Sequence, residues 1–236
     1  MTMITHEVIN DQYIIQVASE AHLGLADTIC NEMENSAKAR GTGIAKRSPL
    51  YLMQKMLEGK AIVAQTLTGE WVGFCYVETW DHGKFVANSG LIVRPDHRKS
   101  GVATHIKQKA FELSRSRYPE AKIIGLTTSL AVMKINSDLG YQPVTLSQLP
   151  GDEAFWKGCQ TCVNYDILTR TERKHCLCTG MLYDPDEPKK PEDKPRWNFL
   201  KESNLYERWQ RLKERVLLRF SNRPNTTKHD RELETA

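Results

Sequence analysis

One stretch of the sequence, Ser89 to Arg117, limits the fold more than any other. It begins with an apolar, strand-like run, turns at Pro95, and continues after Gly101 into a long amphipathic helix. The first N–H groups of a helix have no partner within it and lie at the positive end of its dipole, so they favour an anion. Gly101 lets the backbone approach a ligand closely, and Arg98 and Lys99 add positive charge. The stretch therefore predicts a binding site for a pyrophosphate.

Two common phosphate loops do not fit this stretch. It lacks the Gly-Lys-Ser/Thr of a P-loop and the Gly-x-Gly-x-x-Gly of a dinucleotide-binding fold. Instead, Arg-x-x-Gly-x-Ala at residues 98–103, after a Val-x-Pro strand end, resembles the acyl-CoA motif of the GCN5-related N-acetyltransferase (GNAT) superfamily. A second match, Leu139-Gly140-Tyr141, is similar to the Leu-Gly-Phe that follows the cofactor-binding helix in that family. The resemblance covers about Tyr13 to Leu168.

The apolar pattern on either side of this stretch predicts an α+β fold. Short β-rich runs predict strands at residues 13–17, 61–65, 71–78, 85–93, 122–128, 141–144 and 162–168. Helical spacing of apolar residues predicts helices at residues 19–40, 49–57, 102–117 and 130–139. The crossover through the long helix should make the next strand parallel to its predecessor. The resemblance implies the GNAT-type acyl-CoA N-acyltransferase fold, a mixed and mostly antiparallel sheet flanked by helices, with a C-terminal helical extension.

Length and composition suit one ordinary domain plus this extension. We expect the GNAT acyltransferase domain at residues 1–182, a proline- and charge-rich linker at 183–198, an amphipathic helix at 199–222 and a disordered tail at 223–236. The helix would dock on the domain or on a second subunit, as in a homodimer. A membrane-surface helix is the less favoured alternative.

The charge, the apolar pattern and the cysteine content indicate the cellular location and exclude some classes of partner. The formal net charge is +4, and no basic stripe interleaved with aromatic residues suggests a nucleic-acid partner. No apolar run approaches the roughly 18 residues that span a bilayer, and the polar start does not resemble a secretory signal. We therefore expect a cytoplasmic protein without a membrane span. Its six cysteines then indicate thiols or a metal rather than disulfides.

The resemblance implies acetyl-CoA, or another acyl-CoA such as succinyl-CoA, as the co-substrate. It places the backbone of Leu91, Ile92 and Val93 beside the pantetheine arm, and Ser129 where the family usually has a cofactor-contacting Asn. The pyrophosphate would lie on the loop and first helical turn formed by Arg98, Lys99, Ser100, Gly101, Val102 and Ala103.

The general base is expected at the end of a strand that borders the cleft. Glu78 is our first choice, acting directly or through water. The alternative is that Glu78 is a solvated carboxylate at the strand end without a catalytic role. His82 is a second candidate because it titrates near neutral pH. Many family members carry a Glu on the strand before the long helix, but residues 86–89 here read Val-Ala-Asn-Ser. The usual base is therefore absent from its usual position.

The general acid is also displaced from its usual position. Family members commonly have a Tyr four residues before the Gly of Gly-Phe, and that position is Asn136 here. Asn136 can hydrogen-bond the cofactor sulfur but cannot protonate it. Either Tyr141, Ser137 or water donates the proton, or the thiolate leaves unassisted.

Three cations, Arg40, Lys46 and Arg47, surround the loop that, by resemblance, faces the acceptor. Arginine can hold a carboxylate in a bidentate fork, so the loop favours an acidic amino acid as the acceptor, unless it is merely a solvated basic loop. We therefore expect an N-acyltransferase that acts on a small amine such as glutamate, similar to N-acylglutamate synthases of amino-acid biosynthesis. The alternatives are a protein N-acetyltransferase and a non-catalytic acyl-CoA-binding module, the latter because both common catalytic positions are changed.

Four of the cysteines, Cys159-x-x-Cys162 and Cys176-x-Cys178, have the ligand count of a structural zinc site. If residues 163–168 and 174–180 form a β-hairpin, however, Cys162 lies roughly 16 Å from the level of Cys176, at ~3.3 Å per residue. Coordination by all four thiols requires that hairpin to be broken. The sequence alone therefore leaves zinc unassigned.

Overall fold

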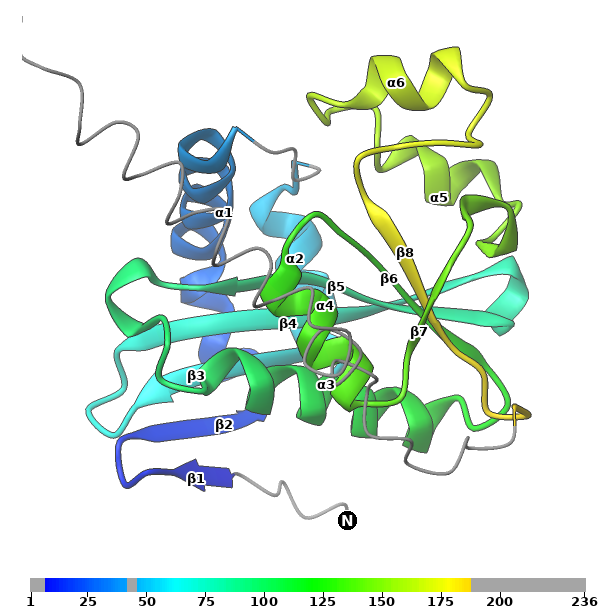
Figure 1. Ribbon diagram of the computed structural model, residues 1–236. Helices are drawn as coiled ribbons and strands as arrows, with labels where there is room; N and C mark the ends of the chain where they lie inside the picture. The colour runs from blue at the N-terminus through cyan, green and yellow to red at the C-terminus, as the bar shows by residue number, and fades with distance from the viewer. Residues whose placement is uncertain (1–6, 42–45, 188–236) are drawn as a thin grey trace, which may run out of the picture. The chain divides into compact units, whose positions relative to one another are not determined.

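A mixed β-sheet forms the centre of the described chain, which comprises residues 7–41 and 46–187 of the computed structural model (Figure 1). Its eight strands have the spatial order β1-β2-β3-β4-β5-β6-β8-β7. In this sheet β5 and β6 are parallel, and the other neighbouring pairs are antiparallel. The strands are β1 (Glu7–Ile9), β2 (Tyr13–Val17), β3 (Ala61–Thr66), β4 (Trp71–Trp80), β5 (Phe85–Val93), β6 (Lys122–Thr127), β7 (Gln142–Val144) and β8 (Thr179–Tyr183). The predicted mixed, mostly antiparallel sheet is confirmed.

Helices cover both faces of this sheet (Figure 1). They are α1 (Ala26–Arg40), α2 (Pro49–Leu57), α3 (Val102–Arg117), α4 (Leu130–Asp138), α5 (Glu153–Lys157) and α6 (Tyr165–Arg170). Helices α1 and α2 bury Ile29 and Leu52 against Tyr76 of β4. Helix α3 buries Ile106 against Val72 of the same strand, in a separate part of the core. The flanking helices that the sequence predicts are therefore present.

Strands β5 and β6 pair over a short distance and then separate. Their last paired residues are Ala87 and Ile124. Beyond this point in the described chain, residues 88–93 of β5 pair only with β4, and residues 125–127 of β6 pair only with β8. The facing backbone edges of β5 and β6 are therefore open to hydrogen bonds from a ligand that enters between them.

Gly90 produces an irregularity in β5 that brings this strand close to Tyr76. The register between β4 and β5 shifts between Phe74 and Tyr76, as expected at a β-bulge. Gly90 has a φ of +66°, which is left-handed. A Cβ atom at this position would lie 2.4 Å from Cε1 of the buried Tyr76 ring. Glycine therefore satisfies both the backbone angle and the packing at this position.

Replacing Gly90 with alanine is expected to lower the free energy of unfolding by about 2–4 kcal/mol, because left-handed strain adds to steric overlap with Tyr76. Gly83→Ala is the matched control, since Gly83 has a φ of +88° with nothing within 4 Å of its Cβ position. In the control, the free energy of unfolding should fall only by the contribution of left-handed strain, about 1–2 kcal/mol. Urea unfolding measures both values, and equal losses would show that contact with Tyr76 adds nothing.

The strand predicted at residues 162–168 is wrong. The structure has helix α6 in this region, and β8 is the strand that completes the sheet. Val163 is 66% exposed, and Leu168 is the buried residue of the helix. The Thr171 hydroxyl donates to the Ile167 carbonyl at 2.8 Å and closes the end of this helix. Short apolar runs do not distinguish a strand from a helix by periodicity alone, which explains the error.

The predicted C-terminal features lie almost wholly outside the described residues. Of the linker at 183–198 the structure describes residues 183–187, whereas the helix at 199–222 and the tail at 223–236 are outside. None of the helices in residues 7–41 and 46–187 combines the length and the apolar character that crossing a bilayer requires.

Candidate active site

The N-terminus of α3 follows the end of β5 through a tight loop. Gly101 is the N-cap of α3 and has a φ of +87°. Lys99 also has a positive φ, of 67°. The Ser100 hydroxyl donates to the His97 carbonyl at 2.6 Å and fixes the turn. Because the first amides of α3 have no acceptor within the helix, the loop presents N–H groups and the positive end of the helix dipole to an anion.

Arg98 is held by the protein rather than extended over this loop. Its Nε donates to the Val93 carbonyl at 3.1 Å, and its Nη2 donates to the Ser36 hydroxyl at 2.7 Å. Nη2 also lies 3.6 Å from Oε1 of Glu32. Since Ser36 and Glu32 belong to α1, Arg98 joins the loop to the end of β5 and to α1. Arg98 thus ties the loop to its neighbours although it is exposed, and Lys99 beside it is also exposed.

The other predicted cofactor contacts lie on elements that border the gap between β5 and β6. Residues 91–93 are on β5 beyond its last pair with β6. Ser129 begins α4, soon after β6 ends, and its hydroxyl accepts from the Val132 amide at 3.4 Å. Val102 is buried and Ala103 is half-buried in the first turn of α3. These residues therefore lie on β5, at the start of α3 and at the N-cap of α4, next to the strands that separate.

Glu78 lies at the level of the sheet where β5 and β6 separate. It pairs with Ala87 of β5, and Ala87 pairs with Ile124 in the last β5–β6 pair. Its side chain is 7% exposed, and its carboxylate accepts a hydrogen bond from the Tyr51 hydroxyl of α2. His82, the other candidate base, is exposed in the turn after β4. The structure therefore favours Glu78 as the base.

Arg47 belongs to the same polar cluster as this carboxylate, because both contact Tyr51. Its Nε donates to the Tyr76 hydroxyl at 2.5 Å, its Nη1 donates to the Lys46 carbonyl at 3.2 Å, and its guanidinium carbon lies 5.8 Å from the Tyr51 ring centroid. Burial alone would lower the pKa of Arg47, but Tyr76 and Glu78 outweigh burial, and the net shift of the pKa is upward. Nη2 makes no hydrogen bond within the residues that the structure describes. It is therefore available to a carboxylate.

Tyr51 and Tyr76 complete the cluster, and the sequence did not single them out. Burial raises the pKa of both hydroxyls far above the usual range, and Glu78 raises it further. Both groups therefore remain protonated hydrogen-bond donors. In the sequence, each tyrosine resembles a core aromatic residue. The available signal was that Tyr76 lies two residues before Glu78 on one strand, where side chains share a face.

The other two cations predicted to bind the acceptor differ from Arg47. Lys46 Nζ lies 3.3 Å from Oε1 of Glu34, and the Lys46 amide donates to the Thr161 hydroxyl at 3.0 Å. Arg40 is the last residue of α1, and its side chain lies outside the described part of the structure. Of the predicted acceptor-binding side chains that the structure describes, Arg47 is the one placed in the Glu78 cluster.

The residues predicted to assist the leaving thiolate are differently placed. Asn136 is 1% exposed, its Nδ2 lies 3.2 Å from the Cβ position of Gly125, and its Oδ1 has no hydrogen-bond partner in the described chain. Tyr141 is fully buried, and its hydroxyl accepts from Asn88 Nδ2 at 3.3 Å. Burial raises the pKa of Tyr141, so its placement favours a packing role. Ser137 is exposed on α4.

Residues 31–134, which include most of α1, the strands β3 to β6 and the α3 loop, match the sequence profile of the acetyltransferase (GNAT) family. Residues 31–134 are thus similar to GNAT acetyltransferases. The match confirms the GNAT resemblance that residues 98–103 and 139–141 suggested. No curated protein sequence matches the chain.

Solved structures share the GNAT fold with this chain. N-acetylglutamate synthase from Neisseria gonorrhoeae, complexed with coenzyme A and N-acetyl-glutamate, is 13% identical with a TM-score of 0.52, and the match covers 74% of this chain and 35% of that one. Rv2747 from Mycobacterium tuberculosis, in complex with CoA and NLQ, is 13% identical with a TM-score of 0.53. The match covers 72% of this chain and 98% of that one. The chain thus spans about a third of the length of the N-acetylglutamate synthase. At this identity the likeness shows the fold.

Proposed function

We propose that this GNAT domain is an acyl-CoA-dependent N-acyltransferase that acylates the amine of a small acceptor with a carboxylate, glutamate first among them. The observation that supports this most is the cluster of Glu78 and Arg47 at the level where β5 and β6 separate. A base suited to an amine and a cation suited to a carboxylate lie together there. The α3 N-terminus, at the end of β5, supplies the site for the anionic cofactor.

Each part of the site has a distinct role in this proposal. The acyl-CoA supplies the acyl group as a thioester, acetyl or succinyl. The amides of Val102 and Ala103 and the charge of Lys99 hold its phosphates. Arg47 binds the acceptor carboxylate through Nη2, and Glu78 takes a proton from the acceptor ammonium, directly or through one water, so that the neutral amine can attack. Asn136, which is buried, stays a predicted hydrogen-bond partner of the cofactor sulfur.

The structural neighbours support the choice of ligands. Both solved structures contain CoA, and that of the N-acetylglutamate synthase also contains N-acetyl-glutamate. An acyl-CoA donor and an acidic acceptor are therefore the first pair to test with this chain. A role in amino-acid biosynthesis, a cytoplasmic location and a homodimer stay predictions from the sequence.

A thiol-release assay tests the proposal. Free CoA is followed from acetyl-CoA and from succinyl-CoA across a panel of amino acids and several peptides. Release confined to glutamate or aspartate supports the proposal, and release with peptides alone identifies a protein N-acetyltransferase. Tight acyl-CoA binding without release for any amine identifies a non-catalytic module and contradicts the proposal.

Arg47→Ala is expected to raise the KM for the acidic acceptor by about 10- to 100-fold, because the acceptor carboxylate loses its charge-assisted hydrogen bonding to the guanidinium. The dissociation constant for acyl-CoA should stay within about twofold. Lys46→Ala is the control, since the Lys46 amine is exposed and pairs with Glu34. Initial rates over a range of acceptor concentrations measure the effect, and an equal rise in both variants would contradict the role of Arg47.

A further inference from the structure

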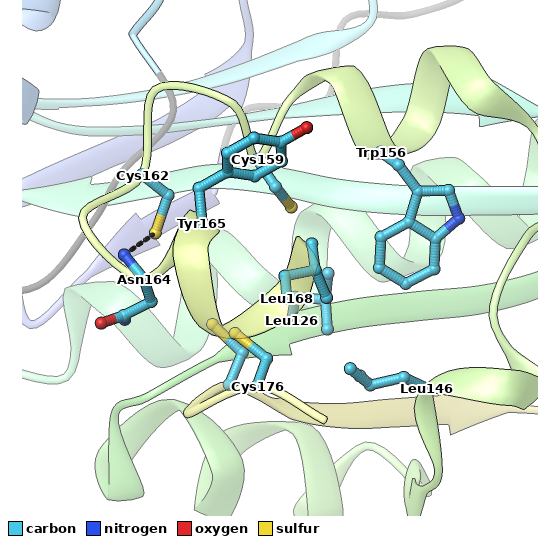
Figure 2. Close-up of a pocket in the computed structure, with 10 residues that line it drawn as sticks. Leu126, Leu146, Trp156, Cys159, Cys162, Asn164, Tyr165, Leu168 and Cys176 are labelled. Carbon is cyan, nitrogen blue, oxygen red and sulfur yellow. Dashed lines mark hydrogen bonds between the residues drawn. The ribbon is translucent and has the colours of Figure 1, made fainter. Parts of the chain in front are cut away.

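Four cysteines from two segments line one small cavity. Cys159 and Cys162 follow α5, whereas Cys176 and Cys178 lie between α6 and β8. All four line a cavity of about 30 Å³ together with apolar side chains such as Leu168. Figure 2 shows Cys159, Cys162 and Cys176 around this shared space. The other two cysteines of the chain, at positions 30 and 75, belong to different parts of the core.

The β-hairpin that argued against a site with all four cysteines is replaced in the structure by helix α6 and a turn. A hairpin would have kept Cys162 and Cys176 apart, but α6 occupies the region instead. After α6 the chain reverses, with the Arg173 amide donating to the Leu168 carbonyl at 2.8 Å. Cys176 and Cys178 follow this reversal, and both line the cavity. Two pairs of thiols, each pair close in sequence, therefore face one cavity.

The local backbone suits sulfur ligands at the first pair. The Cys162 amide donates to the Cys159 carbonyl at 2.9 Å, which makes a tight turn. The Asn164 amide donates to Cys162 Sγ at 3.5 Å, as Figure 2 shows. Backbone hydrogen bonds of this kind orient a thiolate and stabilise its charge.

The segment that carries the cysteines is built from two short helices, which bury Trp156 and Leu168 against the end of the sheet. Helix α5 has five residues and α6 has six, too few for stability of their own. Val163 is 66% exposed and Leu177 is 64% exposed, so neither residue contributes to the core. Small structural units of this kind commonly depend on a metal or a disulfide.

We propose that Cys159, Cys162, Cys176 and Cys178 bind one structural Zn²⁺ ion. Four thiolates in tetrahedral arrangement are a donor set that Zn²⁺ prefers, and such a site leaves no open position for catalysis. In the described chain no three His, Cys, Asp or Glu side chains already surround a point where an ion could bind. Binding must therefore draw the sulfurs inward to about 2.3 Å from the metal, and each thiol gives its proton to solvent as it does so.

The metal content of the full chain, purified without a polyhistidine tag, tests this proposal. Elemental analysis is expected to find about one zinc per chain. Cys162→Ser and Cys176→Ser should each reduce this value at least fivefold. Cys30→Ser and His175→Ala are the controls and should keep the zinc, because Cys30 lies in another core cluster and His175 is exposed.

A second measurement applies even if the cysteine variants do not fold. The full chain expressed in cobalt-supplemented medium should show the visible absorption of tetrahedral Co²⁺ with sulfur ligands. A chain that carries less than about a tenth of an equivalent of zinc and takes up no cobalt under reducing conditions would overturn the proposal. So would a disulfide between two of the four cysteines, or equal loss of zinc in Cys30→Ser. These readouts do not depend on acyltransferase activity.

Discussion

Replacing Gly101 with glutamate is expected to lower the affinity for acyl-CoA by at least about 100-fold, or about 2.7 kcal/mol. The new carboxylate would lie at the N-cap of α3, where the pyrophosphate is expected, and would repel it. The φ of +87° at Gly101 adds left-handed strain in the same loop. Titration calorimetry with acetyl-CoA and with CoA measures the change.

The control for this variant is Gly69→Glu. Gly69 has a φ of +86° in the turn between β3 and β4, with nothing within 4 Å of its Cβ position. It therefore matches Gly101 in backbone angle, open space and added charge. The control should bind acyl-CoA as the unmodified chain does. Undiminished binding in Gly101→Glu would show that the α3 N-terminus does not hold the phosphates.

Replacing Glu78 with glutamine is expected to lower kcat by about 10²- to 10⁴-fold, the usual contribution of a general base. Glutamine keeps the size of the side chain and an oxygen that can accept from the Tyr51 hydroxyl. The deficit should shrink as the pH rises, because more of the acceptor amine is then neutral without help. Steady-state rates of CoA release at several pH values measure both effects.

Glu58→Gln is the matched control for this substitution. Glu58 lies at the end of α2, and its carboxylate is 2.8 Å from Lys60 Nζ. Its removal should leave kcat unchanged. If Glu78→Gln keeps kcat within about threefold, or loses activity by the same factor at every pH, Glu78 serves the structure of the cluster rather than proton transfer.

The sequence predicted the strand, the loop and the helix of residues 89–117 well because their signals are local. A strand end, a glycine at a left-handed position and an amphipathic helix follow one another within residues 89–117, and each has its own physical cause. Strand β1, helix α5 and strand β8 were not predicted. Each has only three to five residues, and so short a run carries too few apolar positions to show a period.

The candidate site was only partly predictable because its contacts join distant residues. Arg47 and Glu78 were each singled out, but their meeting depends on the packing of α2 against β4 through Tyr51 and Tyr76. The ties of Arg98 to α1 likewise depend on a helix far away in the sequence. A charged residue in a motif thus suggests a ligand contact, whereas its actual partner is set by tertiary packing.

The position of β8 between β6 and β7 affects the order in which the nascent chain can fold. Strand β7 pairs with β8, which is made later, at residues 179–183. Until the ribosome has released β8, β7 has no neighbour in the sheet and β6 keeps an exposed edge on that side. Exposed edges invite pairing with other chains. A chain that ends before Thr179 would therefore tend to aggregate even though its acyl-CoA loop is complete.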